Sequence, residues 1–374
     1  MTNSAGARSS LRHRMIMKRI GILNGGGDCP GLNAVTHGVV GAANTLGWEV
    51  VGFRDGFEGL LPPGDYKLLK RSKTQGILKL GGTILGTTNR GHFSSKQGAG
   101  ETVGIERQLI EDAKKTIHQL GVEALIVVGG DGTLSTALQF QRAGVPVIGV
   151  PKTIDNDLQA TAMTFGFDSA VSTVVDALDR LHTTAESHKR VMVVEVMGRH
   201  TGWIALFSGI GGGADIILIP EIPFHYSSIA KAIRKRESEG NHTTLVVVAE
   251  GAAPEGGHQS VESTEGGGEF RLGGIGDRVA CEIERLTGKE TRSCTLGHLQ
   301  RGGSPTSWDR VLATRFGVKA VHLIRDGCFG HMVSYQSYQV GSVPIEEAVE
   351  KLKLVDPTGE VVGTARAVGI SFGD

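Results

Sequence analysis

Residues 122–157 read VEALIVVGGDGTLSTALQFQRAGVPVIGVPKTIDND. An apolar run at 122–128 precedes a glycine turn, a helix-like segment and a second apolar run at 145–150. Strands that are apolar throughout are expected where helices cover both faces of a sheet. The stretch therefore predicts two parallel strands joined by a helix, each strand ending in a polar sequence.

The same alternation extends to both sides of this unit. Further apolar runs occupy 18–23, 190–196, 215–219, 243–250 and 291–297, with helix-like segments between them. This pattern predicts an α/β protein with two doubly wound, mainly parallel-sheet domains. We expect the first domain to comprise 18–166 plus about 300–350 and the second to comprise 167–299, with a helix that starts at Asp168.

Two segments depart from this pattern. Residues 254–275 are rich in glycine and glutamate and are expected to form an exposed loop or insertion. Residues 1–17 are polar and basic, without the apolar core of a secretory signal, and are expected to be a disordered tail.

Composition excludes several classes of function. Lys+Arg and Asp+Glu number 39 each, so no global charge favours nucleic acid or an anionic membrane. No apolar run reaches the length of about 18–20 residues that a membrane span needs. The four cysteines form no CxxC pair, which argues against a zinc site or a disulfide framework and favours a reducing, cytoplasmic location.

Two glycine turns follow predicted strands. NGGGDCPGLNA occupies 24–34 and GGDGT occupies 129–133. Successive glycines let backbone N–H groups converge on an anion, and the following helix N-terminus adds its dipole. An ordinary tight turn remains an alternative for the first motif. GGDGT is found in several kinases, including NAD and lipid kinases, and its Asp131 offers a carboxylate for Mg²⁺ beside phosphates.

The turn PKTIDND, 151–157, places two carboxylates directly after a strand. Asp155 and Asp157 share a face if the stretch is extended and diverge if it turns. One could act as a general base for a hydroxyl and the other could bind a metal or support the first. The alternative is an Asx-rich turn that caps the next helix. Lys152 adds a positive charge beside these acids.

Two further motifs supply basic side chains. MGRHTG occupies 197–202, and LGHLQRGGSP occupies 296–305, where His298 and Arg301 would face one way on a helical turn. Single arginines are usually surface residues. Here Arg190, Arg199, Arg292 and Arg301 each lie next to a predicted strand end, which favours the recognition of phosphate.

The ordered set NGGGDCPGLNA, GGDGT, TIDND, MGRHTGW and LGHLQRGGSP resembles the phosphofructokinase family over about residues 18–325. NAD and lipid kinases share only GGDGT. The resemblance implies a glycolytic kinase that uses Mg²⁺ and transfers a phosphoryl group from ATP or pyrophosphate to the 1-hydroxyl of fructose 6-phosphate. The first domain would bind the donor and Mg²⁺, and the second would bind the sugar phosphate.

The resemblance also implies individual roles. Asp155 is expected to accept the proton of the attacking hydroxyl, supported by Lys152, Thr153 and Asp157, and Asp131 is expected to bind Mg²⁺. The donor phosphates would be lined by Gly27, Arg90, Gly129, Gly130, Gly132 and Thr133. The sugar phosphate would contact Thr153, Asp155, Arg190, Met197, Gly198, Arg199, Glu250, Arg292, His298 and Arg301. Arg190 and Arg292 match arginines that reach a neighbouring subunit's site, so a homotetramer or a dimer is implied.

The sequence departs from the family pattern at several positions. Asn89 stands where many members have an arginine, and Arg90 follows one residue later. His37 and Gly41 stand where bacterial members regulated by nucleotide and phosphoenolpyruvate have two arginines, so that effector site is not expected in its usual form. The 254–275 insertion has no counterpart in the short bacterial form.

Two positions track the phosphoryl donor, and they conflict. Gly132 leaves room for the nucleotide α-phosphate, whereas Lys152 is usual in the pyrophosphate enzymes. We give Gly132 more weight, because an absent side chain cannot exclude a phosphate, while a lysine can contact the phosphates of either donor. ATP is therefore expected as the donor, with pyrophosphate as the alternative.

Other functions remain open. A catalytically inactive sensor of a sugar phosphate or nucleotide would share the fold, although it would have no need of Asp131, Asp155 and Asp157. A relative of NAD or lipid kinases would phosphorylate another acceptor. Sedoheptulose 7-phosphate is a close neighbour of fructose 6-phosphate and could share its site.

Overall fold

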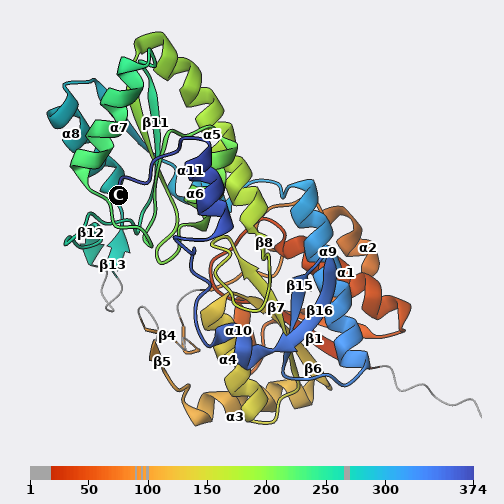
Figure 1. Ribbon diagram of the computed structural model, residues 1–374. Coiled ribbons are helices and arrows are strands. Elements are labelled where there is room, and N and C mark those ends of the chain that lie inside the picture. The colour runs from red at the N-terminus through yellow and green to blue at the C-terminus, as the bar shows by residue number, and fades with distance from the viewer. Residues whose placement is uncertain (1–17, 89–90, 94–95, 98–100, 265–269) are drawn as a thin grey trace, which may run out of the picture.

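The computed structural model describes residues 18–88, 91–93, 96–97, 101–264 and 270–374. The predicted tail, 1–17, and Arg90 lie outside the described residues. Figure 1 shows two lobes, each built around a sheet with helices on both of its faces. The predicted α/β class with two mainly parallel sheets is confirmed.

The larger sheet forms the first lobe. Its parallel strands are β15, β7, β6, β1 and β2, and antiparallel β16 and β3 lie at its two edges. The order along the sheet is β16(Gln339–Pro344), β15(His331–Gln336), β7(Val147–Thr153), β6(Ala124–Gly129), β1(Arg19–Asn24), β2(Glu49–Phe53) and β3(Tyr66–Leu69), with β8(Phe165–Gly166) beside β7.

The smaller sheet forms the second lobe and is entirely parallel. Its order is β10(Ile216–Leu218), β11(Thr244–Ala249), β9(Val191–Val196) and β14(Thr291–Thr295). The seven predicted strands of the two sheets therefore form, with ends shifted by at most two residues in nearly every case. The side chains of β6, β7, β9 and β11 are buried at every position, because both faces are covered.

Helices cover both faces of each sheet. In the first lobe α1(Leu32–Thr45) and α9(Ser307–Arg325) pack on one face, while α3(Arg107–Gln119), α4(Asp131–Arg142) and α10(Ile345–Val349) pack on the other. In the second lobe α5(Phe167–His188) and α6(Trp203–Gly211) face the first lobe, and α7(Tyr226–Ser238) and α8(Ile275–Thr287) lie outside. The shorter helices are α2(Arg71–Thr74), α11(Glu360–Ala367), η1(Gly56–Leu60), η2(Gln75–Ile77) and η3(Gly297–Arg301).

Helices α1 and α9 approach each other very closely. A Cβ atom at Gly38 would lie 2.5 Å from the carbonyl oxygen of Thr314, and one at Gly317 would lie 2.4 Å from that of Val35. Only glycine fits at either position. This contact fixes the loop that precedes α1, where the first glycine motif lies.

The chain crosses between the lobes three times. It enters the second lobe through α5 and returns through α9. After α10 the C-terminal segment runs back, and Ser371 pairs with Ile216 beside β10 (Figure 1). The predicted 254–275 insertion contains a hairpin of β12(Val261–Thr264) and β13(Phe270–Leu272), and a second hairpin joins β4(Lys96–Gln97) to β5(Glu101–Thr102). Within the described ranges, no helix is both long and apolar enough to cross a membrane.

Candidate active site

The loops after β1, β6 and β7 lie side by side, because these strands are parallel neighbours. Gly25 donates from its backbone N–H to the carbonyl of Val128 at 2.9 Å. A Cβ atom at Gly129 would lie 2.3 Å from the side chain of Thr133, so the glycine lets Thr133 pack against the first loop. The structure thus brings together the predicted donor residues Gly27, Gly129, Gly130, Gly132 and Thr133.

The carboxylate stretch turns immediately after β7. Thr153 accepts a hydrogen bond through Oγ1 from the N–H of Asp155 at 3.1 Å, and Asn156 has a left-handed backbone with φ 50°. Of the two geometries open from the sequence, the structure has the turn. Oδ1 of Asp157 has no hydrogen-bond partner among the described residues.

Burial raises the pKa of the carboxyls in this turn. The pKa of Asp155 is raised by burial, an effect that the nearby Arg301 and Lys152 oppose. The pKa of Asp157 rises to about 7, chiefly by burial and then by the charge of Asp155. Glu250, which follows β11, also has a pKa raised to about 7 by burial and by Asp155. Asp157 and Glu250 can therefore exchange protons near neutral pH.

Lys152 lies within the protein rather than at its surface. Its side chain is 4% exposed, and its Nζ donates to the carbonyl oxygen of Gly27 at 2.5 Å. Burial lowers its pKa, whereas the charges of Asp155 and Asp157 act in the opposite direction. The lysine thus joins the carboxylate turn to the first glycine loop.

The second lobe contributes the loops after β9 and β11. Met197, Gly198 and Arg199 follow β9, and the N–H of Glu250 donates to the carbonyl of Val196 at 2.8 Å. Arg199 acts on both carboxyls, since its charge opposes the rise in pKa of Asp155 and of Glu250. The predicted sugar residues of these loops therefore face the carboxylate turn across the lobes.

The short helix η3 contains the predicted pair of 6-phosphate residues. Arg301 donates through Nη1 to the carbonyl of Asp28 at 3.3 Å, beside the first glycine loop. His298 is exposed on the same turn. Arg301 thus lies close to Asp155, and His298 faces solvent.

Arg190 and Arg292 are not part of this cluster. They lie at the start of β9 and in the first residues of β14, the opposite strand ends from Met197 and His298. Both pair with Glu290, at 2.7 Å from Arg190 and 2.6 Å from Arg292. The parallel strands β9 and β14 start side by side, so the two arginines lie at the same, N-terminal end of these strands. This end is the one away from Asp155.

Several residues at the site were not predicted from the sequence. Gln300 is fully buried, and its Oε1 accepts from the N–H of Met197 at 3.2 Å. Lys353, from the C-terminal segment, contacts the carboxylate turn. Gln300 lies inside a quoted motif and could have been noted, whereas nothing in the local sequence marks Lys353.

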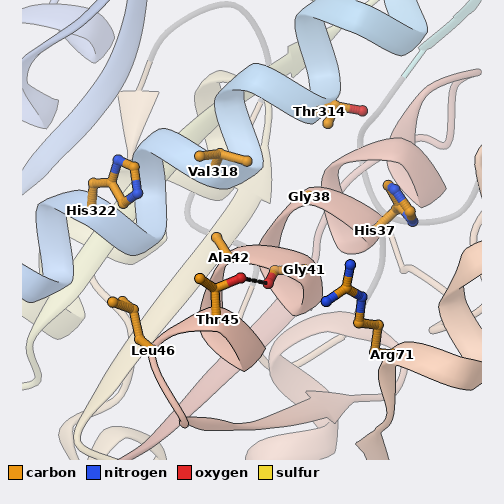
Figure 2. Close-up of a pocket in the computed structure, with 10 residues that line it drawn as sticks. All are labelled: His37, Gly38, Gly41, Ala42, Thr45, Leu46, Arg71, Thr314, Val318 and His322. Atoms are coloured by element: carbon orange, nitrogen blue, oxygen red, sulfur yellow. Dashed lines mark hydrogen bonds between the residues drawn. The ribbon is translucent and has the colours of Figure 1, made fainter.

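A separate pocket of about 370 Å³ lies between α1 and α9 (Figure 2). It includes His37 and Gly41, the two positions where the sequence departs from the regulated bacterial pattern, together with Arg71 and His322. Among the described residues that line it, Arg71 alone carries a permanent charge. Neither the glycine loops nor the carboxylate turn contribute to it.

Comparisons with known proteins agree with this geometry. The family described as Phosphofructokinase matches residues 19–324. An ATP-dependent 6-phosphofructokinase from Chloroflexus aggregans is 52% identical over 357 residues, 96% of this chain and 98% of that protein. A pyrophosphate–fructose 6-phosphate 1-phosphotransferase from Amycolatopsis methanolica is 48% identical over 342 residues, 91% of this chain and 96% of that protein.

A solved structure, that of phosphofructokinase from Saccharomyces cerevisiae, has a TM-score of 0.77 and 30% identity. It is matched over 89% of this chain but only 45% of its own length, so this chain spans less than half of that yeast chain.

Proposed function

The chain belongs to the phosphofructokinase family, and we propose that it is a 6-phosphofructokinase that uses ATP. It transfers the γ-phosphoryl group of ATP to the 1-hydroxyl of fructose 6-phosphate, giving fructose 1,6-bisphosphate in glycolysis. One observation supports this most strongly. Asp155, Arg301 and Glu250 follow three different strands of two sheets, and yet Arg301 lies close enough to Asp155 to oppose the rise in its pKa, and Asp155 lies close enough to Glu250 to raise the pKa of that carboxyl.

The cluster fits phosphoryl transfer, which depends on positioning and charge neutralisation more than on covalent chemistry. Asp155 accepts the proton of the 1-hydroxyl, and the rise in its pKa through burial makes its carboxylate a stronger base. Asp157 and Thr153 support the turn, while Met197, Gly198, Arg199 and Glu250 hold the sugar. Arg301 and His298 bind the 6-phosphate, and Nη1 of Arg301 also donates to the carbonyl of Asp28.

The residues beside the donor loops fit Mg²⁺. Asp131 is the first residue of α4, next to the glycine loop, and Oδ1 of Asp157 is buried without a hydrogen-bond partner among the described residues. No group of three or more His, Cys, Asp or Glu side chains in the described part of the chain could hold a metal alone. Such a sparse set suits Mg²⁺, which binds one or two carboxylates and completes its shell with phosphates and water. Bound there, Mg²⁺ would neutralise the donor phosphates.

The assignment of ATP rests on Gly132, which is weighed against Lys152. Gly132 is the second residue of α4 and has no side chain to oppose an α-phosphate. Lys152 is usual in pyrophosphate enzymes, and its buried Nζ beside Gly27 is well placed for a terminal phosphate of either donor. Relatives of similar identity are named for both donors, and Gly132 is the residue that favours ATP. Pyrophosphate, favoured by Lys152, is the second candidate.

The assembly is also part of the proposal. Arg190 and Arg292 lie at the opposite end of the strands from Asp155, and Glu290 holds both at one edge of the small sheet. That position suits side chains that complete the site of a neighbouring subunit in a homotetramer or a dimer. A cytoplasmic location accords with four cysteines that are all free.

The proposal is tested by following the reaction products directly. Purified protein with fructose 6-phosphate, MgCl₂ and ATP should give ADP and fructose 1,6-bisphosphate, observed by ³¹P NMR. Absence of product with both ATP and pyrophosphate would favour the inactive sensor. Replacing the acceptor with sedoheptulose 7-phosphate in the same assay measures the breadth of the sugar site.

A further inference from the structure

The C-terminal segment passes directly behind the carboxylate turn. Leu352 pairs with Leu158, and the N–H of Lys353 donates to the carbonyl of Asp157 at 2.8 Å. The carbonyl of Lys353 accepts from Nε1 of Trp203 at 2.7 Å. Trp203 begins α6, immediately after the MGRHTG loop. The backbone of one residue thus contacts elements of both lobes.

The side chain of Lys353 is fully hydrogen-bonded within the protein. Its Nζ donates to Oδ1 of Asn156 at 3.1 Å and to the carbonyls of Thr161 and Ala162 at 3.0 and 3.2 Å. These three acceptors match the three donors of an ammonium group. The same Nζ lies 5.8 Å from the ring centroid of Trp203. Because all three N–H donors of the ammonium group have partners, the largely buried side chain of Lys353 is held in one position.

Asn156 is the residue on which the turn depends. It lies between Asp155 and Asp157 and has a left-handed backbone with φ 50°, a conformation that asparagine adopts more readily than most other residues with a side chain. Its Oδ1 accepts from the N–H of Thr164 at 3.0 Å as well as from Lys353. Rotation at this residue would move the two carboxylates relative to each other.

We propose that Lys353 is a positioning residue for phosphoryl transfer: by holding Asn156 and the backbone of Asp157, it fixes the turn that directs Asp155 and Asp157 into the site. This inference rests on the proposed phosphofructokinase function, because Asp155 is the proposed base. Lys353 differs from Lys152, whose Nζ contacts the glycine loop. Burial lowers the pKa of Lys353 to about 8, and the charge of Asp157 opposes this shift, which accords with a cation close behind the carboxylate.

The test compares Lys353→Met with Lys351→Met, an exposed lysine of the same segment. We expect Lys353→Met to lower kcat about 100-fold, since small displacements of catalytic groups cost factors of this size. KM for both substrates should change by less than about threefold, because the phosphate-binding residues stay in place. Lys353→Arg, which retains the charge, should recover part of kcat. A kcat for Lys353→Met equal to that of Lys351→Met, measured well below Tm, would overturn the inference.

A second variant covers the case in which Lys353→Met fails to fold. Asn156→Gly permits the positive φ but removes the Oδ1 acceptor, and it should lower kcat without lowering affinity. The loss of kcat in the double variant should be smaller than the product of the two single losses, since both changes remove the contact between Lys353 and Asn156. A loss equal to that product would contradict the proposal.

A readout without substrate separates this inference from the proposed function. Hydrogen exchange of the peptide 153–164 should be faster in Lys353→Met than in Lys351→Met, with unchanged exchange elsewhere in β7. If the wild type is inactive but exchange of 153–164 is faster in Lys353→Met, the proposed function is refuted, while the role of Lys353 in holding the turn is retained. An active wild type whose turn and kcat are both unchanged in Lys353→Met would refute the inference alone.

Discussion

The ammonium nitrogen of Lys152 lies 2.5 Å from the carbonyl oxygen of Gly27, so a buried cation joins the carboxylate turn to the first glycine loop. We expect Lys152→Met to lower kcat/KM for ATP by about 10- to 100-fold, the usual effect of losing one charge-assisted hydrogen bond. KM for fructose 6-phosphate should change much less. Initial rates at varied ATP test this, and an unchanged kcat/KM for ATP would remove Lys152 from the donor site.

Asp155→Ser should lower kcat by about 10²- to 10⁴-fold, which is the contribution of a general base. KM for both substrates should stay within a few-fold, because the phosphates are held by other groups. Asp179→Ser, an exposed aspartate on α5, is the control and should match the wild type. If kcat of Asp155→Ser barely moves, another residue is the base.

Glu250 should make sugar binding dependent on pH. Its pKa is raised to about 7 by burial, so the carboxylate that accepts sugar hydroxyls is lost as the pH falls through that value. KM for fructose 6-phosphate should therefore rise between pH 8 and 6. In Glu250→Gln the KM should be higher and the pH dependence weaker. An identical pH profile in the two proteins would show that another group titrates.

Asp157 should reduce stability in the ligand-free protein at neutral pH. The pKa of Asp157 is about 7 in the folded protein and 3.8 for an ordinary aspartate, as in the unfolded chain. Between these two pH values the folded state therefore binds one proton more than the unfolded state. Stability at this site therefore falls as the pH rises through that window. Asp157→Asn should raise Tm at pH 8 and raise it less at pH 5. A Tm gain that grows as the pH falls would reverse the sign and contradict the assignment.

The strand pattern predicted the four strands of the small sheet and β1, β6 and β7 of the large sheet, and the order of motifs predicted most of the central cluster, whereas β2, β3, β15 and β16 were not predicted. Parallel strands of one sheet end side by side, so Asp131 and Asp155 after β6 and β7 were expected to converge, whereas Glu250 follows β11 of the other sheet and reaches them through the packing of the two lobes. The sequence analysis placed Arg190 and Arg292 next to strand ends but did not say which end. Both lie at the start of their strands, whereas the motifs MGRHTG and LGHLQRGGSP follow the other end. Lys353 was missed because its contact with Asn156 spans 197 residues and no local pattern marks it.

The two distant arginines lead to a prediction about mixed oligomers. Arg292→Ser and Asp155→Ser should each be nearly inactive alone. Unfolding and refolding them together should restore part of the activity, because one site of a hybrid then has both an intact base and an intact arginine from its neighbour. Wild-type protein refolded alone controls for recovery. No gain over the separate variants would place Arg292 outside the partner's site.

The donor preference of the wild-type protein tests the proposed function most directly. Fructose 6-phosphate and Mg²⁺ are held at saturation while ATP or pyrophosphate is varied separately. Gly132 predicts that kcat/KM for ATP exceeds that for pyrophosphate by at least about 100-fold, or about 2.7 kcal/mol of transition-state stabilisation. Gly132→Asp should reduce the use of ATP specifically. Turnover with pyrophosphate and none with ATP would contradict the assignment of an ATP-dependent 6-phosphofructokinase.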